Sequence, residues 1–426
     1  MSFSSLKIDR WLCTALTSLG IKKPTPVQAG CIGPALSGND VMGISQTGSG
    51  KTAAFAIPIL NTLCKDPYGI FSVILTPTRE LAVQISEQFE AFSGGSFPLR
   101  TELVVGGLSI QDQAARITTK PHIVVATPGR LSWLINNCPN VKDCFKRVKF
   151  LVLDEADRLV DEQFSKELSV ILEALPSSRQ TFYFTATLTP TLAQVKEAVT
   201  DLFFWSESDN NIVVLPPSLS HDYVFIPEIT KDCWTLYLLQ NIEHRTSIVF
   251  CSACEVAEIL SNTLKKLGIK AISLHAQLPQ RKRMHNLDEF RNNHATVLVT
   301  TDVASRGLDI STVDLVINHD VPRVAVDYVH RSGRTARIGR FGRVVTLISQ
   351  FEIELIQKIE EHIGFKLNEF EGFSDLELIV LKQLDKISSV KKEVKLAIDD
   401  YDFGQKNRKR RARNDNEIRR NFKKNS

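Results

Sequence analysis

What the sequence most plainly lacks is a long hydrophobic segment. Its 426 residues contain no run of about 18 apolar ones, so we expect no membrane-spanning helix and no membrane partner. The opening stretch, Met1–Ser4, has neither the charged region nor the apolar segment of a secretory signal, so we expect no export. Hydrophobic residues still make up 43% of the sequence, which is enough for full cores, and the length predicts two or three domains.

Cysteine pairs of the kind that bind zinc are also missing. The eight cysteines are scattered, and only Cys251 and Cys254 have the C-x-x-C spacing. No second pair follows that would complete a structural zinc site. Because Cys251 ends an apolar run, we expect buried free thiols in a reducing compartment.

The body of the chain lacks an excess of positive charge. The net charge is +4, but residues 404–426 hold ten Lys or Arg and two acids, so the other 403 residues sum to −4. Nucleic-acid binding by the body would therefore need a local groove. The tail, 404–426, is polar and predicted to be disordered. It could be simply solvated, hold a nucleic acid nearby or act as a nuclear import signal.

A glycine-rich phrase after the apolar run Asp40–Ile44 predicts a phosphate-binding loop. Successive backbone N–H groups in such a turn wrap phosphate oxygens, and the following helix adds its positive N-terminus. Lys51 would reach the β- and γ-phosphates, and the Thr52 hydroxyl would face Mg²⁺. Ser45 replaces the usual first glycine and is small enough to fit. The predicted nucleotide-binding residues of this phrase are Gln46, Thr47, Gly48, Ser49, Gly50, Lys51 and Thr52.

An acidic phrase, Asp154–Asp157, follows a second apolar run, Phe150–Leu153, and would complete the site. Asp154 can hold Mg²⁺ through water, and Glu155 can position or deprotonate an attacking water. An acidic cluster is often only a solvated face, and a lone GKT phrase can occur by chance. The two phrases, ~100 residues apart and each capping a strand-like run, are hard to obtain by accident. The sequence therefore predicts an NTPase.

Short β-branched runs alternate with longer helix-like segments, which predicts an α/β fold with two doubly wound parallel sheets. We expect domains at 1–205 and 219–370, a linker at 206–218 and an extension at 371–403 before the basic tail. Polar phrases end many of the runs, at the sheet edge where such folds bind ligands. Besides 40–44, the predicted strands are Ser72–Thr76, Leu103–Val105, Ile123–Ala126, Phe150–Leu153, Thr181–Phe184, Ser247–Phe250, Ala271–Leu274, Thr296–Val299, Leu315–Asn318 and Val344–Ile348.

The second half has no phosphate loop of its own but contains the arginine-rich phrase His330–Arg337. Arg334 and Arg337 are three positions apart, so on one helical turn they would face the same way. A pair of arginines presented to a phosphate held by the first domain would act as an arginine finger within one chain. A merely basic helix surface is the alternative.

Taken together, these phrases resemble those of the DEAD-box ATP-dependent RNA helicases, over about residues 3–350. The resemblance implies two tandem RecA-like domains, ATP and Mg²⁺ as cofactors and RNA as the substrate. The phrase Gly20–Gln28 resembles the adenine-reading motif of that family, so Gln28 would bond the base and Phe3 would stack on it. Asp309 resembles the ribose contact.

The resemblance also implies a set of RNA contacts and coupling residues. Arg79 and Arg130 would bond phosphates, and Gly106–Gly107 would allow close backbone approach. The residues that would couple hydrolysis to strand separation are Asp157, Thr185, Thr187 and His330. The RNA-binding residues would be Pro77, Thr78, Arg79, Gly106, Gly107, Thr127, Pro128, Gly129 and Arg130 in the first domain, and Gln280, Arg283 and Thr301 in the second.

Departures from the family pattern are small and remove no catalytic charge, so we expect an active enzyme. They are Ser45, Thr185, Ala276 and Ser332. The residues around the motifs are similar to those of a compact fungal nucleolar branch of the family, whose members act in maturation of the small ribosomal subunit. That implies a monomer in the nucleus and nucleolus, with pre-rRNA and ribosome-assembly proteins as partners. The alternatives are an ATP-gated RNA clamp or scaffold that depends little on turnover, and a DNA helicase.

Overall fold

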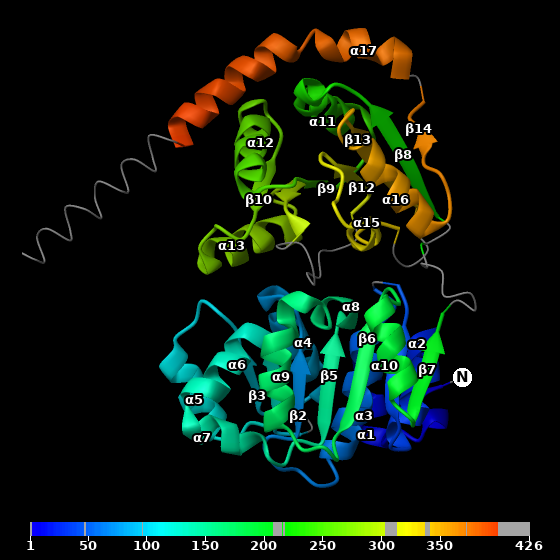
Figure 1. Cartoon of the computed structure of the whole chain (residues 1–426), viewed down its shortest axis with the longest axis vertical. Helices are drawn as coiled ribbons and strands as arrows, with labels where there is room; N and C mark the ends of the chain where they lie inside the picture. The colour runs from blue at the N-terminus through cyan, green and yellow to red at the C-terminus, as the bar shows by residue number, and fades with distance from the viewer. Residues whose placement is uncertain are drawn as a thin grey trace, which may run out of the picture.

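Two α/β units follow one another along the chain and lie one above the other in Figure 1. The computed structural model describes residues 2–46, 48–95, 97–207, 215, 218–302, 313–336, 341–371 and 373–398. Within those ranges, no helix is both long and apolar enough to cross a membrane. The eight cysteines are free thiols, four of them buried, as the scattered spacing predicts.

The first unit is built on a seven-stranded sheet of parallel strands in the order β3-β4-β2-β5-β6-β1-β7. Its central strands are buried on both faces, which is why they read as near-continuous Val, Ile and Leu runs. The strands are β1 (Asp40–Ile44), β2 (Ser72–Leu75), β3 (Thr101–Val104), β4 (Ile123–Ala126), β5 (Phe150–Asp154), β6 (Gln180–Thr185) and β7 (Leu202–Ser206).

Helices cover both faces of this sheet and enclose two apolar cores. One core includes Phe55, Phe89 and Phe184, and the other includes Leu131 and Ile171; all five are fully or almost fully buried. The helices are α1 (Arg10–Ser18), α2 (Pro26–Leu36), α3 (Lys51–Leu63), α4 (Arg79–Ser93), α5 (Ile110–Thr118), α6 (Pro128–Asn137), α7 (Pro139–Lys142), α8 (Ala156–Leu159), α9 (Ser165–Ala174) and α10 (Pro190–Ala198), with short 3-10 turns η1 (Phe3–Leu6), η2 (Asp143–Phe145) and η3 (Glu162–Phe164).

The second unit repeats the plan with a parallel sheet in the order β10-β11-β9-β12-β13-β8-β14. Its strands are β8 (Leu219–Phe225), β9 (Ser247–Phe250), β10 (Ala271–Leu274), β11 (Val297–Thr300), β12 (Leu315–Asn318), β13 (Gly342–Ile348) and β14 (Asn368–Glu369). Its helices are α11 (Lys231–Asn241), α12 (Cys254–Lys266), α13 (Gln280–Arg291), α15 (Ala325–Ser332), α16 (Ile353–Ile363) and α17 (Phe373–Leu381), with the 3-10 turn η4 (Glu228–Thr230). The predicted fold class, two doubly wound parallel sheets, is confirmed.

The C-terminal extension is helical and packs on the second unit. α17 and a further helix over 384–398 cross the side that faces away from the first unit (Figure 1). Val380, Ile387 and Val394 are buried there. Lys391 Nζ lies 2.5 Å from Asp232 Oδ2 of α11. The basic tail, 404–426, lies outside the described residues.

Candidate nucleotide and RNA sites

The glycine-rich phrase forms a loop between β1 and α3, as predicted. Lys51 is the first residue of α3, and its Nζ donates to the carbonyl oxygens of Ser45 (2.7 Å) and Gln46 (2.9 Å). Gly50 has φ +90°, a conformation that side chains rarely adopt. The loop therefore curls around the ammonium group at the carboxyl end of β1. Thr47 lies outside the described residues.

Gln28 joins the expected base-reading motif to this loop. Its Oε1 accepts from the backbone N–H of Thr25 at 3.0 Å, and its Nε2 donates to the carbonyl of Gly50 at 3.1 Å. A Cβ on Gly50 would lie 2.3 Å from that nitrogen, so only glycine leaves room. Phe3 is 5% exposed and packs in the first core, and its stacking role stays a prediction. Asp309 lies outside the described residues.

The acidic phrase begins where β5 ends, beside the loop. Asp154 is buried, and burial together with the adjacent Glu155 carboxylate raises the pKa of Asp154 to about 7. An ionised carboxylate in such a place is costly unless a cation lies next to it. α3, with Thr52 in its first turn, lies against β5. Asp154 and Thr52 are therefore oxygen donors that fit Mg²⁺.

Glu155 stands in a strained conformation at the end of this strand. Its φ is +53°, in the left-handed region that a residue with a Cβ adopts at a cost of about 1–3 kcal/mol. Strain of this kind persists only where surrounding structure fixes it. Here Glu155 is the N-cap of the short helix α8, and its backbone N–H donates to Asp154 Oδ1 at 3.1 Å.

Three of the predicted coupling residues meet where the two units touch. Asp157 Oδ2 of α8 accepts from the Thr187 hydroxyl at 2.6 Å and lies 3.4 Å from His330 Nε2 of α15. Burial alone would raise the pKa of Asp157. The neighbouring His330 and Thr187 outweigh burial and lower this pKa to about 2. The Thr185 hydroxyl donates to the Thr187 carbonyl at 3.0 Å. The contact thus links the acidic phrase, the end of β6 and the second unit.

A neighbouring ion pair across the same contact was not predicted. Arg158 of α8 pairs with Asp327 of α15, and their side chains are 14% and 8% exposed. In the sequence, Arg158 looks like a solvated residue beside an acidic phrase. Asp327 and His330 are three positions apart on one helix and so face α8 together. That spacing is the signal that could have revealed the pair.

This pair gives a prediction about domain closure. Arg158→Asp should weaken RNA binding in the presence of a non-hydrolysable ATP analogue by about tenfold. Breaking a buried ion pair costs about 3–5 kcal/mol. The expected effect is smaller because, in the wild-type protein, water solvates Arg158 when the units separate. RNA affinity without nucleotide should not change. The double variant Arg158→Asp/Asp327→Arg should recover most of the loss, measured by fluorescence anisotropy. Equal losses with and without nucleotide would contradict a role in closure.

Arg334 of the predicted arginine pair lies outside the helix that carries His330. α15 ends at Ser332, and Arg334 lies in the turn that follows, with 3% of its surface exposed. The chain leaves the helix because Thr335 forms a parallel bridge with Val313 and Ala336 adopts φ +56°. Arg334 therefore does not lie on helix α15. Arg337 itself lies outside the described residues.

Six of the predicted RNA-binding residues in the first unit line one cavity of about 450 Å³. They are Pro77, Arg79, Gly106, Thr127, Gly129 and Arg130, and the other lining residues are Ile110, Trp133 and Phe164. A Cβ on Gly106 or Gly107 would come within 2.6 or 2.8 Å of the Arg79 guanidinium, so both glycines admit that side chain. Thr78 and Pro128 are buried at the starts of α4 and α6.

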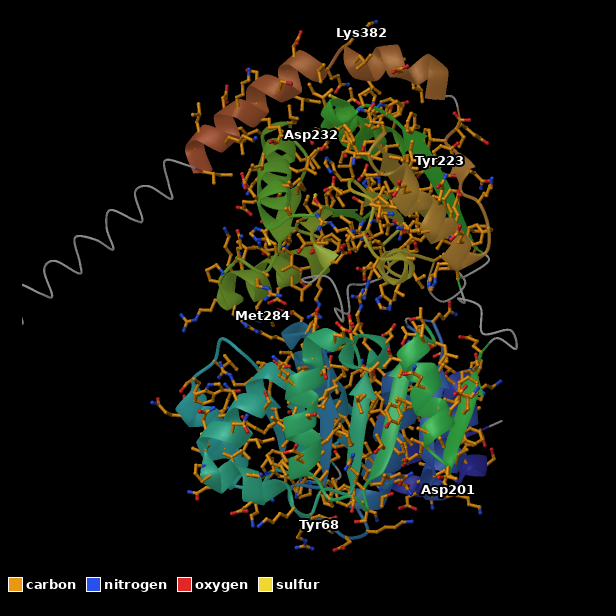
Figure 2. The ribbon with its side chains drawn as sticks, viewed as in Figure 1. Tyr68, Asp201, Tyr223, Asp232, Met284 and Lys382 are labelled. Carbon is orange, nitrogen blue, oxygen red and sulfur yellow. The ribbon has the colours of Figure 1, made fainter. Side chains whose placement is uncertain are left out.

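The predicted RNA residues of the second unit are largely engaged elsewhere. Arg283 Nη2 lies 2.7 Å from Glu80 Oε1 of the first unit, and Gln280 Nε2 donates to the same oxygen at 3.2 Å. Both come from α13, the helix that carries the labelled Met284 where the units approach (Figure 2). Thr301 is 6% exposed. Here Gln280 and Arg283 join the two units, and their contact with RNA stays a prediction.

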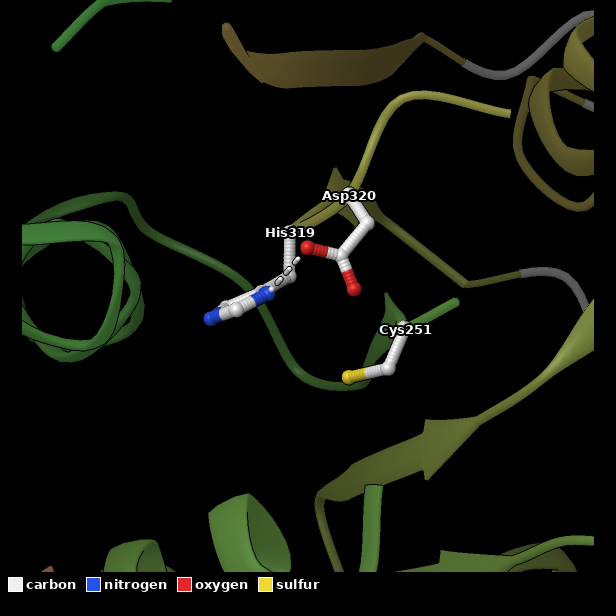
Figure 3. A group of neighbouring side chains, drawn as sticks. All are labelled: Cys251, His319 and Asp320. Atoms are coloured by element: carbon white, nitrogen blue, oxygen red, sulfur yellow. Dashed lines mark hydrogen bonds and ion pairs between the residues drawn. The ribbon is translucent and has the colours of Figure 1, made fainter. Parts of the chain in front are cut away.

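Among the described residues, one group has the composition of a metal site: Cys251, His319 and Asp320 (Figure 3). His319 Nδ1 lies 3.1 Å from Asp320 Oδ1, and its Nε2 lies 3.0 Å from Asp232 Oδ1. Burial alone would lower the pKa of His319. The two carboxylates outweigh burial and raise this pKa to about 9. A charged imidazolium has no lone pair for a metal. The group is therefore an ion-pair network, which Lys391 extends to the C-terminal helix.

Comparison with known proteins gives one consistent result. Residues 25–195 match the family described as DEAD/DEAH box helicase, and residues 230–339 match the helicase conserved C-terminal domain. The chain is 42% identical to ATP-dependent RNA helicase DBP8 of Candida glabrata over 97% of each chain. It is also 42% identical to probable ATP-dependent RNA helicase DDX49 of Homo sapiens, over 95% of this chain and 84% of that one.

Two solved structures resemble the whole arrangement. Dbp5 of S. cerevisiae, bound to RNA and ADP BeF3, superposes with a TM-score of 0.78 at 27% identity, covering 90% of this chain and 99% of that one. Mss116p, bound to ssRNA and AMP-PNP, gives a TM-score of 0.80 at 27% identity, covering 90% and 82%.

Proposed function

Because the chain belongs to the DEAD-box family of ATP-dependent RNA helicases, we propose that it couples RNA-stimulated ATP hydrolysis to local duplex unwinding or to remodelling of RNA–protein contacts. The observation that carries this proposal is the meeting of α8 and α15. There Asp157 of the acidic phrase contacts His330 of the second unit, and the next residue, Arg158, pairs with Asp327. A change at the nucleotide can thereby move one unit against the other.

The chemistry follows from the charges around the loop. Lys51 would neutralise the β- and γ-phosphates, while Asp154 and Thr52 would hold Mg²⁺. The metal would supply Lewis-acid stabilisation of the charge on the phosphate oxygens. Glu155 accepts the proton of the attacking water, and Arg334 stabilises charge that develops on the transferred group. Gln28 bonds adenine, which favours ATP over GTP.

RNA recognition is proposed to rest on the backbone of the strand. Arg79 and Arg130 donate to phosphates along the cavity of the first unit, beside Gly106 and Gly129. Phosphates and sugars carry no sequence information, so the protein should accept many RNA sequences. The separation of strands then follows closure of the two units on one strand.

We place this activity in maturation of pre-rRNA and assembly of the small ribosomal subunit, in the nucleus and nucleolus, with the protein as a monomer. The residues in and around the motifs resemble those of the fungal nucleolar branch, and this resemblance supports the placement. The chain is also similar to ATP-dependent RNA helicase DBP8 over 97% of both chains. Ribosome-assembly proteins would supply the target that the backbone contacts do not select.

A strand-separation assay distinguishes a helicase from an ATP-gated clamp. With Mg²⁺ and ATP, the full chain should separate a short RNA duplex under single-turnover conditions, and ADP should not support the reaction. A DNA duplex of the same sequence is the matched control and should stimulate hydrolysis less. In cells, crosslinking should recover pre-rRNA. Tight ATP-dependent RNA binding without strand separation would favour the clamp, and equal stimulation by DNA would contradict RNA selectivity.

A further inference from the structure

The RNA-facing cavity of the first unit has an apolar wall that the backbone contacts do not use. Ile110, Trp133 and Phe164 line the same cavity as Arg79 and Arg130. Trp133 and Ile110 are 43% and 37% exposed, which is high for side chains of their size. The cavity therefore combines two cations with a large open aromatic surface.

Three separate elements bring this wall together. Trp133 stands three positions after Arg130 on α6, so both side chains lie on one face of that helix. Ile110 is the first residue of α5, and Phe164 is the last residue of η3. Helix α6 thus presents a guanidinium and an indole ring to the same space, one turn apart.

Single exposed apolar residues are common on proteins and need no explanation. Leu172, which is 38% exposed, is an example outside this cavity. The wall differs because its three members converge on one concave site beside phosphate-binding arginines. A phosphate or a ribose gains little from an indole face. A nucleobase gains a stacking surface, and every base has such a face.

We propose that Trp133, backed by Ile110 and Phe164, is a stacking platform for one unpaired base of the RNA strand. The inference rests on the proposed RNA-binding function of this groove. Arg79 and Arg130 hold the phosphates on either side of that base, and the ring of Trp133 takes the place of its neighbour in the stack. A base held in this way is withdrawn from the duplex, so the site favours an unpaired strand end. Because stacking is tolerant of sequence, the platform ranks bases by stacking strength only.

The test compares Trp133→Ala with Trp133→Phe in the full chain, using a fluorescein-labelled single-stranded RNA and an ATP analogue. Trp133→Ala should weaken RNA affinity by about 5- to 100-fold, and Trp133→Phe should keep most of it. The salt dependence should separate stacking from charge. Trp133→Ala should leave the slope unchanged, whereas Arg130→Ala should reduce it by about 0.7. Phe351→Ala, at a residue 73% exposed on the second unit, is the matched control.

A second measurement keeps the proposal open to refutation if the alanine variant folds poorly. RNA should quench the tryptophan emission of the wild-type protein, and Trp133→Phe should lose that quenching while it still binds. Normal affinity in Trp133→Ala beside weakened Arg130→Ala would overturn the platform and leave the helicase assignment standing. The absence of RNA binding by the wild-type protein would instead overturn the proposed function itself.

Discussion

Replacing Glu155 by Gln should lower RNA-stimulated ATP turnover by roughly a hundredfold or more while ATP still binds. The amide has the shape of the carboxylate but cannot take a proton from water. The strained turn at Glu155 is a property of the backbone after β5, so the substitution should leave the loop and Asp154 in place. Turnover is measured with saturating RNA, and ATP affinity with a fluorescent nucleotide.

The matched control for this experiment is Glu162→Gln, at an exposed acidic residue a few positions further along the chain. It should behave as the wild-type protein does. Near-normal RNA-stimulated hydrolysis by Glu155→Gln would remove Glu155 from the proton-transfer role. Loss of ATP binding in the same variant would show that the carboxylate acts in the ground state instead.

Substituting Arg334 should have the largest effect of all, on the order of 10³-fold in turnover, with ATP affinity little changed. An arginine finger acts on charge that develops only in the transition state. Arg334 directly follows α15, whose His330 and Asp327 reach α8 of the first unit. We therefore expect the docking of α15 on α8 to bring Arg334 toward the phosphate loop.

Arg334→Ala and Arg334→Lys should both be slow, because a lysine lacks the planar fork of donors. The control is Arg323→Ala, at an exposed arginine in the same unit. Steady-state measurements give kcat and KM separately, and a fall in kcat alone is the expected result. A rise in KM of the same size as the fall in kcat/KM would mean that Arg334 only binds ATP. Thermal unfolding should confirm that each variant is folded.

The central strands can be predicted from this sequence because each is buried on both faces and reads as a short β-branched run. At one edge of each sheet, β7 is an aromatic run without β-branched residues, and β14 is two exposed polar residues, so neither matches that pattern. β8 was missed for a different reason, because its buried residues His221 and Asp222 are polar and interrupt the apolar run. The β-branched pattern therefore identifies the central strands and misses strands that are aromatic, very short or interrupted by buried polar residues.

The chemistry of the site could be predicted wherever one short sequence motif contains all the residues that perform it. The phosphate loop and the acidic phrase each sit at one strand end, so spacing alone identifies them. Contacts between distant phrases are different. Arg158 meets Asp327, and Glu80 meets Arg283, only because the two sheets, which are far apart along the chain, come together. Local spacing also misplaced Arg334, since the bridge from Thr335 to Val313 that ends the helix is a tertiary contact.

The character of these contacts matters for a machine that must open again. The pairs Arg158–Asp327, His330–Asp157 and Arg283–Glu80 all involve groups that water solvates well. When the units separate, water solvates each partner of these ion pairs. Separation therefore exposes no apolar surface at these points. Repeated cycles can therefore proceed without the aggregation that an apolar hinge would invite. The same surfaces would form an interface when the units are closed and a solvated protein surface when the units are open.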